Sequence, residues 1–215
     1  MEELGKPKVI REDISEKESL STNESPENII VEVGSGTIPY LNFASHGYHK
    51  RFFENPSLHY VALDLNAKDL KESKDDLMLI DKELAQSGRM HYVKADGVKL
   101  PFSDGSVAQV ILSNIPGNLR TTSTQRENMI REAARVLKIG GIMKFVEIYD
   151  PHVTINEDLL SFIRRPDSGF EEIQLRDITT LLPEEDYDRE LVKQGATGSF
   201  ILNFRKKDTV PDLNG

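Results

Sequence analysis

The chain has 215 residues, no cysteine and a formal net charge of −9 at pH 7. This length predicts one domain with enough apolar sequence for a core, so the fold needs no disulfide or metal. The missing cysteines exclude a cysteine nucleophile and a thiolate zinc site, and they fit a reducing cytoplasm. The acidic balance argues against broad binding to nucleic acid or to an anionic membrane surface. No stretch approaches the roughly 18 consecutive apolar residues of a membrane span, and the charged N-terminus is unlike a secretory signal.

Residues 1–27 contain eight acidic and four basic residues and little periodic apolar sequence. Such a composition buries little surface and predicts a mobile arm. The alternative is a lid that folds over a ligand, with apolar side chains such as Val9, Ile14 and Leu20 docking on it. We therefore expect an arm over 1–27, a folded domain over 28–206 and a frayed tail over 207–215.

A short β-branched run over 29–33 predicts the first buried strand. It ends in Gly34-Ser35-Gly36, and apolar residues then recur at helical spacing from Pro39 to Asn55. A strand, a glycine turn and a helix in this order open a nucleotide-binding βαβ unit. Glycine suits that turn because the chain bends tightly and the backbone must approach a ligand.

The details of this turn indicate the charge of the ligand. A dinucleotide site typically reads G-x-G-x-x-G, but Pro39 occupies the place of the third glycine and has no N–H to donate. Glu32 stands two residues before Gly34, where its carboxylate would repel a diphosphate. We therefore expect an ammonium or sulfonium group at this loop.

The rest of the chain alternates between strand and helix patterns. Strands are expected over 58–65, 90–95, 107–112, 142–148, 170–178 and 200–205, and helices over 67–86, 124–138 (ended by Gly140-Gly141) and 155–164. This order predicts an α/β fold: a doubly wound, mostly parallel seven-stranded sheet with helices on both faces and an antiparallel C-terminal hairpin.

Ligands of open α/β sheets bind beyond the carboxyl ends of the strands. That rule brings together the groups that follow the first four strands, namely Glu32 with the glycine loop, Asp64, Asp96 and Ser113-Asn114. A carboxylate at the end of the second strand can accept two hydrogen bonds from a ribose diol, and Asp96 can accept one from an exocyclic amine. One small molecule lying across the strand ends could touch all of them.

At these residues the chain resembles the class I, Rossmann-like S-adenosylmethionine-dependent methyltransferases. Four segments in family order carry the likeness: Val31-Glu32-Val33-Gly34-Ser35-Gly36, Ala62-Leu63-Asp64-Leu65, Ala95-Asp96 leading into Leu100-Pro101-Phe102-Ser103-Asp104-Gly105-Ser106, and Glu132-Ala133-Ala134-Arg135-Val136-Leu137-Lys138-Ile139-Gly140-Gly141. The likeness covers 28–150, and more loosely extends to 206. The loop departs from the commoner E-x-G-x-G-x-G because Ile38 stands where the last glycine would be.

The resemblance implies S-adenosylmethionine as the cofactor and a role for each matched residue. It implies that Glu32, Gly34, Ser35 and Gly36 line the methionine end, that Asp64 binds the ribose hydroxyls, that Leu65 packs on the adenine or ribose, that Asp96 and Gly97 hold the adenine, and that Asn114 lies near the methyl group. No residue is assigned as a catalytic base, and no metal site is expected.

The acceptor is expected to be a small molecule or a protein group rather than nucleic acid. The first alternative is a methyltransferase-like binding or scaffold protein without catalysis. The second is a nicotinamide-dependent oxidoreductase, which Glu32 and Pro39 oppose.

Several of these residues also have purely structural interpretations. Asp64 could cap a helix, and Asp104-Gly105 has the sequence of a turn. His46, His49 and His152 are interpreted as surface or packing residues rather than bases. A strip formed by Arg120, Arg126, Arg131 and Arg135 is interpreted as a solvated helix face, with an anionic substrate as the alternative.

Overall fold

A computed structural model of the chain describes residues 29–37, 52, 54–115, 121–147, 157–177 and 200–208. The predicted arm over 1–27, nearly all of the predicted helix from Pro39 to Asn55 and the last residues of the predicted tail lie outside the described residues. The three histidines discussed above, Ile38 and Arg120 also lie outside them. Within the described ranges, no helix is long and apolar enough to cross a membrane.

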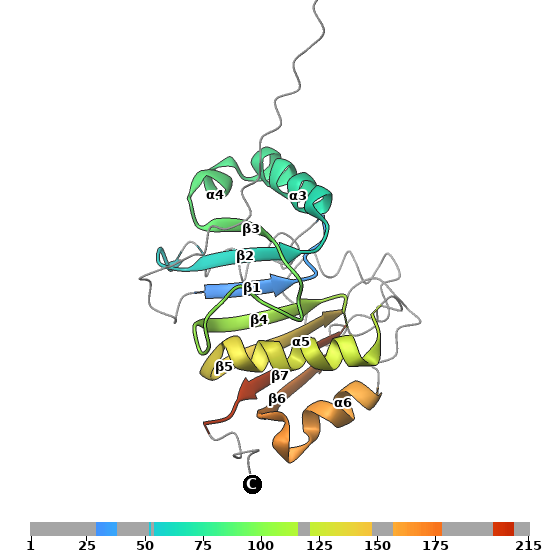
Figure 1. The fold of residues 1–215 in the computed structure, drawn as a ribbon. Helices are drawn as coiled ribbons and strands as arrows, with labels where there is room; N and C mark the ends of the chain where they lie inside the picture. The colour runs from blue at the N-terminus through green and yellow to red at the C-terminus, as the bar shows by residue number, and fades with distance from the viewer. Residues whose placement is uncertain are drawn as a thin grey trace, which may run out of the picture.

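Seven strands form one sheet in the order β3-β2-β1-β4-β5-β7-β6 (Figure 1). Their bounds are Ile29–Val33 (β1), His59–Asp64 (β2), Met90–Lys94 (β3), Val107–Ser113 (β4), Leu137–Glu147 (β5), Phe170–Asp177 (β6) and Phe200–Lys206 (β7). The first five strands pair in parallel, whereas β7 runs antiparallel to both β5 and β6. The predicted fold class is confirmed.

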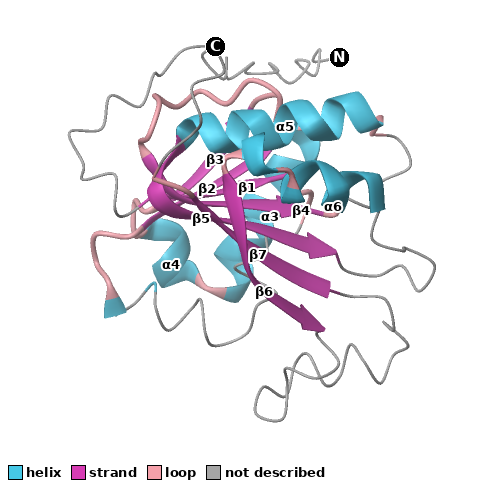
Figure 2. Cartoon of the chain, turned by 90° about the horizontal axis from the view of Figure 1, so that it is seen from below, coloured by secondary structure: helices cyan, strands magenta, loops and turns pink. Residues whose placement is uncertain are grey.

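Helices cover both faces of the sheet (Figure 2). Their bounds are Ala67–Ile80 (α3), Lys82–Gln86 (α4), Ser123–Val136 (α5) and Glu157–Arg164 (α6), followed by a 3₁₀ turn over Pro166–Ser168. Side chains of β1 alternate between the faces, so Val31 and Val33 pack in the core with α5 and α6, and Ile30 packs in the core with α3 and α4. Both faces of the central strands are therefore buried, and only their ends can meet a ligand.

The expected helix over 67–86 is in fact two helices, because Asp81 interrupts it. Asp81 has φ −142° and serves as the C-cap of α3 and the N-cap of α4. Its carboxylate accepts a hydrogen bond from the Leu84 N–H at 2.9 Å. A short acidic side chain that bonds the local backbone competes with helix continuation, and here it ends one helix and begins the next.

The boundary between α5 and β5 also differs from the prediction. The helix ends at Val136 and the strand begins at Leu137, five residues before the predicted start at 142. Val107 pairs with Leu137 but Gln109 pairs with Ile142, so β5 holds three more residues than β4 between these pairs. Gly140 and Gly141 therefore lie in an irregular stretch of strand rather than in a helix cap.

Candidate functional site

The glycine loop after β1 folds back over the end of β2. The N–H groups of Gly34 and Ser35 both donate to the Leu63 carbonyl oxygen, at 2.9 and 3.3 Å. Gly34 has φ +75°, and a Cβ placed on it would lie 2.8 Å from the Ser113 carbonyl oxygen of β4. Only glycine fits a left-handed position with so little space, so this residue fixes the loop between β2 and β4.

Asp64, the last residue of β2, joins the glycine loop to the start of α3. Its Oδ2 accepts from the Gly36 N–H at 3.0 Å, and its Oδ1 accepts from the Asn66 N–H at 2.9 Å. Asn66, rather than Asp64, is the N-cap of the helix. Each carboxylate oxygen can accept a further hydrogen bond, so these contacts orient Asp64 without exhausting its capacity for a ligand.

The loop after β3 lies beside Asp64. The Ala95 N–H donates to the Asp64 carbonyl oxygen at 3.1 Å. Asp96 is exposed, and its Oδ1 accepts from the Val98 N–H at 3.0 Å in an Asx turn. Gly97 is buried, and a Cβ there would lie 2.6 Å from Val33 Cγ1. This close approach holds the Asp96 turn against the end of β1.

Two exposed side chains complete the edge. Asn114 follows β4 with φ 51°, a left-handed conformation that costs a non-glycine residue about 1 kcal/mol or more. Its N–H donates to the Val146 carbonyl oxygen at 2.8 Å, which anchors the backbone while the side chain stays exposed. Leu65, next to Asp64, is 61% exposed, which leaves an apolar surface beside the carboxylate.

Glu32 lies inside the molecule rather than on the open edge. It is 1% exposed, and its carboxylate accepts hydrogen bonds from the Ser113 Oγ at 2.5 Å and from the Tyr60 hydroxyl. The donors come from β4 and β2, the two strands that flank β1. Sequence reasoning missed Tyr60. The sequence held no signal for it, because Tyr60 shares a face with Glu32 only through the pairing of Glu32 with Ala62 in the sheet.

Ser35 carries a buried hydroxyl in the glycine loop. Its side chain is buried, and within the part of the chain that the structure describes its Oγ has no hydrogen-bond partner. Buried polar atoms are normally paired, so this hydroxyl is suited to a polar ligand group.

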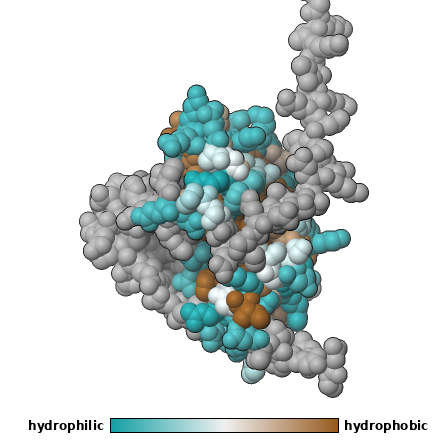
Figure 3. Space-filling model, turned by 90° about the vertical axis from the view of Figure 1, so that its left-hand side faces the viewer, coloured by the Kyte–Doolittle hydropathy of each residue, from teal (hydrophilic) through white to brown (hydrophobic). Residues whose placement is uncertain are grey.

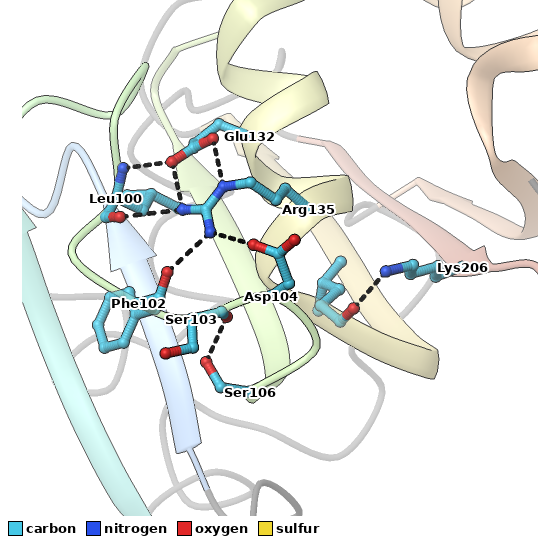
Figure 4. Close-up of polar contacts among 9 residues, drawn as sticks. Leu100, Phe102, Ser103, Asp104, Ser106, Glu132, Arg135 and Lys206 are labelled. Carbon is cyan, nitrogen blue, oxygen red and sulfur yellow. Dashed lines mark hydrogen bonds and ion pairs between the residues drawn. The ribbon is translucent and has the colours of Figure 1, made fainter. Parts of the chain in front are cut away.

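An ion-pair network holds the turn segment between β3 and β4 (Figure 4). Arg135 of α5 bonds both oxygens of Glu132, at 2.6 and 2.9 Å, and Asp104 at 2.6 Å. It also donates to the Leu100 and Phe102 carbonyl oxygens, at 3.1 and 2.9 Å. The bonds from Arg135 lower the pKa of the Glu132 carboxyl, and the two carboxylates raise the pKa of Arg135. Arg135 and Asp104 therefore have structural roles here.

The sheet order brings the predicted strand-end groups to one edge. Along the sheet, the Asp96 turn lies at the carboxyl end of β3, Asp64 at that of β2, the glycine loop at that of β1 and Asn114 at that of β4. Glu32 lies beneath them in the core. In the described ranges, no cluster of three or more histidine and acidic side chains could hold a metal ion. The carboxylates of Asp64 and Asp96 at this edge can accept hydrogen bonds from hydroxyl or amine donors of a ligand.

Comparison with known sequences identifies a family. Residues 9–162 match the model of the ubiE/COQ5 methyltransferase family. A ubiquinone/menaquinone biosynthesis C-methyltransferase UbiE of Pseudomonas savastanoi pv. phaseolicola is 33% identical over 127 residues, which span 58% of this chain and 43% of that protein. The protein of the same name from Ectopseudomonas mendocina is 32% identical over 148 residues, which span 67% of this chain and 52% of that protein. The chain thus matches about half the length of these relatives.

Solved structures share the fold. A geranyl diphosphate methyltransferase in complex with SAM has a TM-score of 0.56 and 13% identity, with 85% of this chain and 79% of that chain covered. A putative methyltransferase of Bacillus halodurans has a TM-score of 0.53 and 17% identity, with 86% and 95% covered. The cyclase SpnF has a TM-score of 0.56 and 18% identity, with 84% and 75% covered. At such identities the likeness establishes the class I methyltransferase fold alone.

Proposed function

The chain belongs to the ubiE/COQ5 methyltransferase family, and from this membership we propose that it is an S-adenosylmethionine-dependent methyltransferase acting on a small molecule. The observation that carries the proposal is the edge of the sheet at which Gly34–Gly36, Asp64, the Asp96 turn and Asn114 meet. Its chemistry is that of a site for a cationic nucleoside.

The side chains on this edge fit S-adenosylmethionine group by group. Asp64, already oriented by two backbone N–H groups, would accept from the ribose hydroxyls. The exposed Leu65 would pack on the adenine or ribose, and Asp96 with Gly97 would hold the adenine. The Ser35 hydroxyl would gain a partner at the methionine end. Asn114, whose side chain is exposed after β4, would lie near the methyl group.

Glu32 would act on the methionine end through charge rather than by direct exposure. A buried carboxylate beneath the loop favours a cation above it, since Coulomb attraction is weakly screened away from water. Tyr60 and Ser113 hold both carboxylate oxygens and so keep that charge in place.

S-adenosylmethionine, when bound, supplies a methyl group that its sulfonium has already activated for in-line displacement. The chain's own residues would then have to align the acceptor with that methyl group and exclude water. When the acceptor is itself nucleophilic, such a reaction depends on binding groups and on the shape of the site more than on a dedicated base. This explains why the cofactor edge can be recognised from the sequence although no catalytic base can.

The family supports a small organic acceptor. The relatives named above are ubiquinone/menaquinone biosynthesis C-methyltransferases, so a quinol ring carbon is the first acceptor class to test. The net charge of −9 disfavours a nucleic-acid substrate. The second candidate is a methyltransferase-like binding or scaffold protein without catalysis, since no residue is assigned as a catalytic base.

The proposal is tested by titration calorimetry with S-adenosylmethionine, followed by transfer assays with the methyl-labelled cofactor. We expect saturable binding that falls at least about tenfold in Asp64→Ala, since hydrogen bonds to a charged group are worth about 1.5–3 kcal/mol. Gly34→Arg should abolish binding, because a side chain there meets the backbone of β4. Asp76→Ala, an exposed aspartate of α3, is the matched control and should bind like the wild type.

The acceptor panel should contain demethylated benzoquinols and naphthoquinols, other small phenols and a protein extract. Labelled quinol product supports the proposal in full. Cofactor binding without transfer to any acceptor would favour the non-catalytic alternative. Binding of a nicotinamide dinucleotide in place of S-adenosylmethionine would contradict the proposal.

A further inference from the structure

A hollow of about 690 Å³ lies at the end of the sheet away from the glycine loop. Its lining consists of Asp104, Gly105, Arg131, Ala134, Arg135, Lys138, Ile139 and Lys206. These residues come from the turn before β4, the last turns of α5, the start of β5 and the end of β7. The seven residues of β4 separate this end from the other, which corresponds to about 20 Å at the rise of a strand.

The hollow concentrates positive charge on a strongly acidic chain. Four cationic side chains line it, whereas the whole chain has a net charge of −9. Arg135 is neutralised by Glu132 and Asp104. Among the residues that the structure describes, no carboxylate is ion-paired with Arg131, Lys138 or Lys206. Asp104 also lines the hollow and acts on Lys206, where its charge raises the lysine pKa. The four cations less the carboxylates of Glu132 and Asp104 therefore leave two net positive charges at the hollow.

The ordinary reason for cations near a helix C-terminus accounts for only part of this arrangement. The helix dipole attracts basic residues to the last turn, and Arg135 is the basic residue of that turn in α5. Arg131 lies a turn earlier, with its guanidinium 5.0 Å from the centre of the Phe162 ring. Lys206 belongs to β7, and its Nζ donates to the Leu137 carbonyl oxygen at 2.6 Å (Figure 4). Burial lowers the pKa of Lys206, so an anion bound beside it would favour its charged form.

An apolar surface adjoins these charges. Ile139 is 60% exposed, and Ala134 lies in the same lining. Figure 3 faces this end of the molecule and shows brown apolar surface set among teal hydrophilic surface in its lower half. An exposed isoleucine beside three cationic side chains suits a ligand that has both an anionic group and an apolar part.

We propose that this hollow is a binding site for the phosphate group of an organic phosphate, either a free ester or the headgroup of an anionic phospholipid. The fork of Arg131 suits phosphate oxygens, Lys138 and Lys206 add point charges, and Ile139 contacts the apolar part of the ligand. The volume lies in the range of small-molecule sites, which is about 300–1,000 Å³. The site is separate from the proposed cofactor edge and does not depend on the proposed function.

The test uses two probes on the full chain at low salt, namely inorganic diphosphate by titration calorimetry and phosphatidylglycerol vesicles by co-sedimentation. Vesicles of phosphatidylcholine serve as the neutral reference. The double variant Arg131→Gln/Lys138→Gln removes two charges from the hollow. Lys74→Gln/Lys82→Gln removes the same charge from exposed positions in α3 and α4 and is the matched control. Thermal unfolding of each variant checks that its fold is kept.

We expect one probe to bind the wild type, with at least about tenfold weaker binding in the hollow variant and less than about a twofold change in the control. Diphosphate binding identifies a free ester as the source, and binding to phosphatidylglycerol alone identifies a lipid headgroup. The proposal is overturned if neither probe binds, if both double variants weaken binding equally, or if an oligoglutamate peptide displaces the bound probe at equal concentration.

Discussion

Gly34 and Gly36 have similar backbone conformations but differ in the space available for a side chain. Both have positive φ, at +75° and +58°. A Cβ on Gly34 would lie 2.8 Å from a carbonyl oxygen of β4, whereas a Cβ on Gly36 would meet nothing within 4 Å among the described residues. The two positions therefore separate backbone strain from steric overlap.

Substitution of these glycines by alanine tests that difference. Gly36→Ala should lower the free energy of unfolding by about 1 kcal/mol, the cost of a left-handed alanine. Gly34→Ala should lower it by about 1–3 kcal/mol more, because the backbone of β4 must shift to admit the methyl group. Denaturant unfolding of both variants measures the difference. Equal losses would show that β4 does not press on the loop.

At the residue scale the sequence located the groups at the strand ends but not all of the groups that support them. The glycine loop and Asp64 could be found because they stand at strand ends, which local patterns locate. The hydroxyl bonds of Tyr60 and Ser113 to Glu32 could not be found, because they depend on which strands flank β1. The functional roles of these residues stay predictions until the cofactor is titrated.

Among the elements, α5 does more than cover the sheet. Glu132 and Arg135 bond the backbone of the turn segment 100–105, including the Leu100 N–H, which donates to Glu132 Oε1 at 2.7 Å. The Gly105 N–H also donates to the Arg135 carbonyl oxygen at 3.0 Å. The helix therefore fixes the connection that follows the proposed adenine turn.

This network predicts the behaviour of the protein in acid. The bonds from Arg135 hold the pKa of Glu132 below its ordinary value of 4.5, so the folded state binds that proton less readily than the unfolded state. The contribution of Glu132 to stability is present above pH 4.5 and is lost as the pH falls below it. Glu132→Gln should therefore lose stability near pH 7 and show a smaller further loss between about pH 5 and 3.

Thermal unfolding across that pH range measures the effect. Glu83→Gln, at an exposed position in α4, is the control and should follow the wild-type pH dependence. A Glu132→Gln variant whose acid limb is as steep as that of the wild type would show that the ion pair does not couple to folding.

Element types were predictable from apolar periodicity, but two element ends were not. In the sequence, Asp81 fits the polar face of one continuous helix. The break between α3 and α4 is evident only from the hydrogen bond that its carboxylate accepts from the Leu84 N–H. The glycine pair at 140–141 is typical of a helix end. The strand had already begun at Leu137, because pairing with Val107 of β4 extends it backward. Both outcomes follow from contacts that a local pattern does not contain.

For the whole molecule, the strand order matters more than any single residue. Placing β1 between β2 and β4 gathers the ends of four strands on one edge, and it leaves the basic hollow at the other end of the sheet. The alternation of elements predicted a doubly wound, mostly parallel sheet with an antiparallel C-terminal hairpin, but it did not give the strand order. The hollow was not predicted, because Lys206 lies near the end of α5 only as a result of the antiparallel pairing of β7 with β5.

We propose that an adenosyl sulfur compound lies across the carboxyl ends of β1 to β4. Amide hydrogen exchange with and without saturating S-adenosylhomocysteine tests it most directly. We expect slower exchange in the segments 34–36, 64–66, 96–98 and 113–115, and unchanged exchange over 131–139 at the opposite end. Unchanged exchange in those four segments, or protection confined to other parts of the chain, would show that the cofactor does not bind at these strand ends.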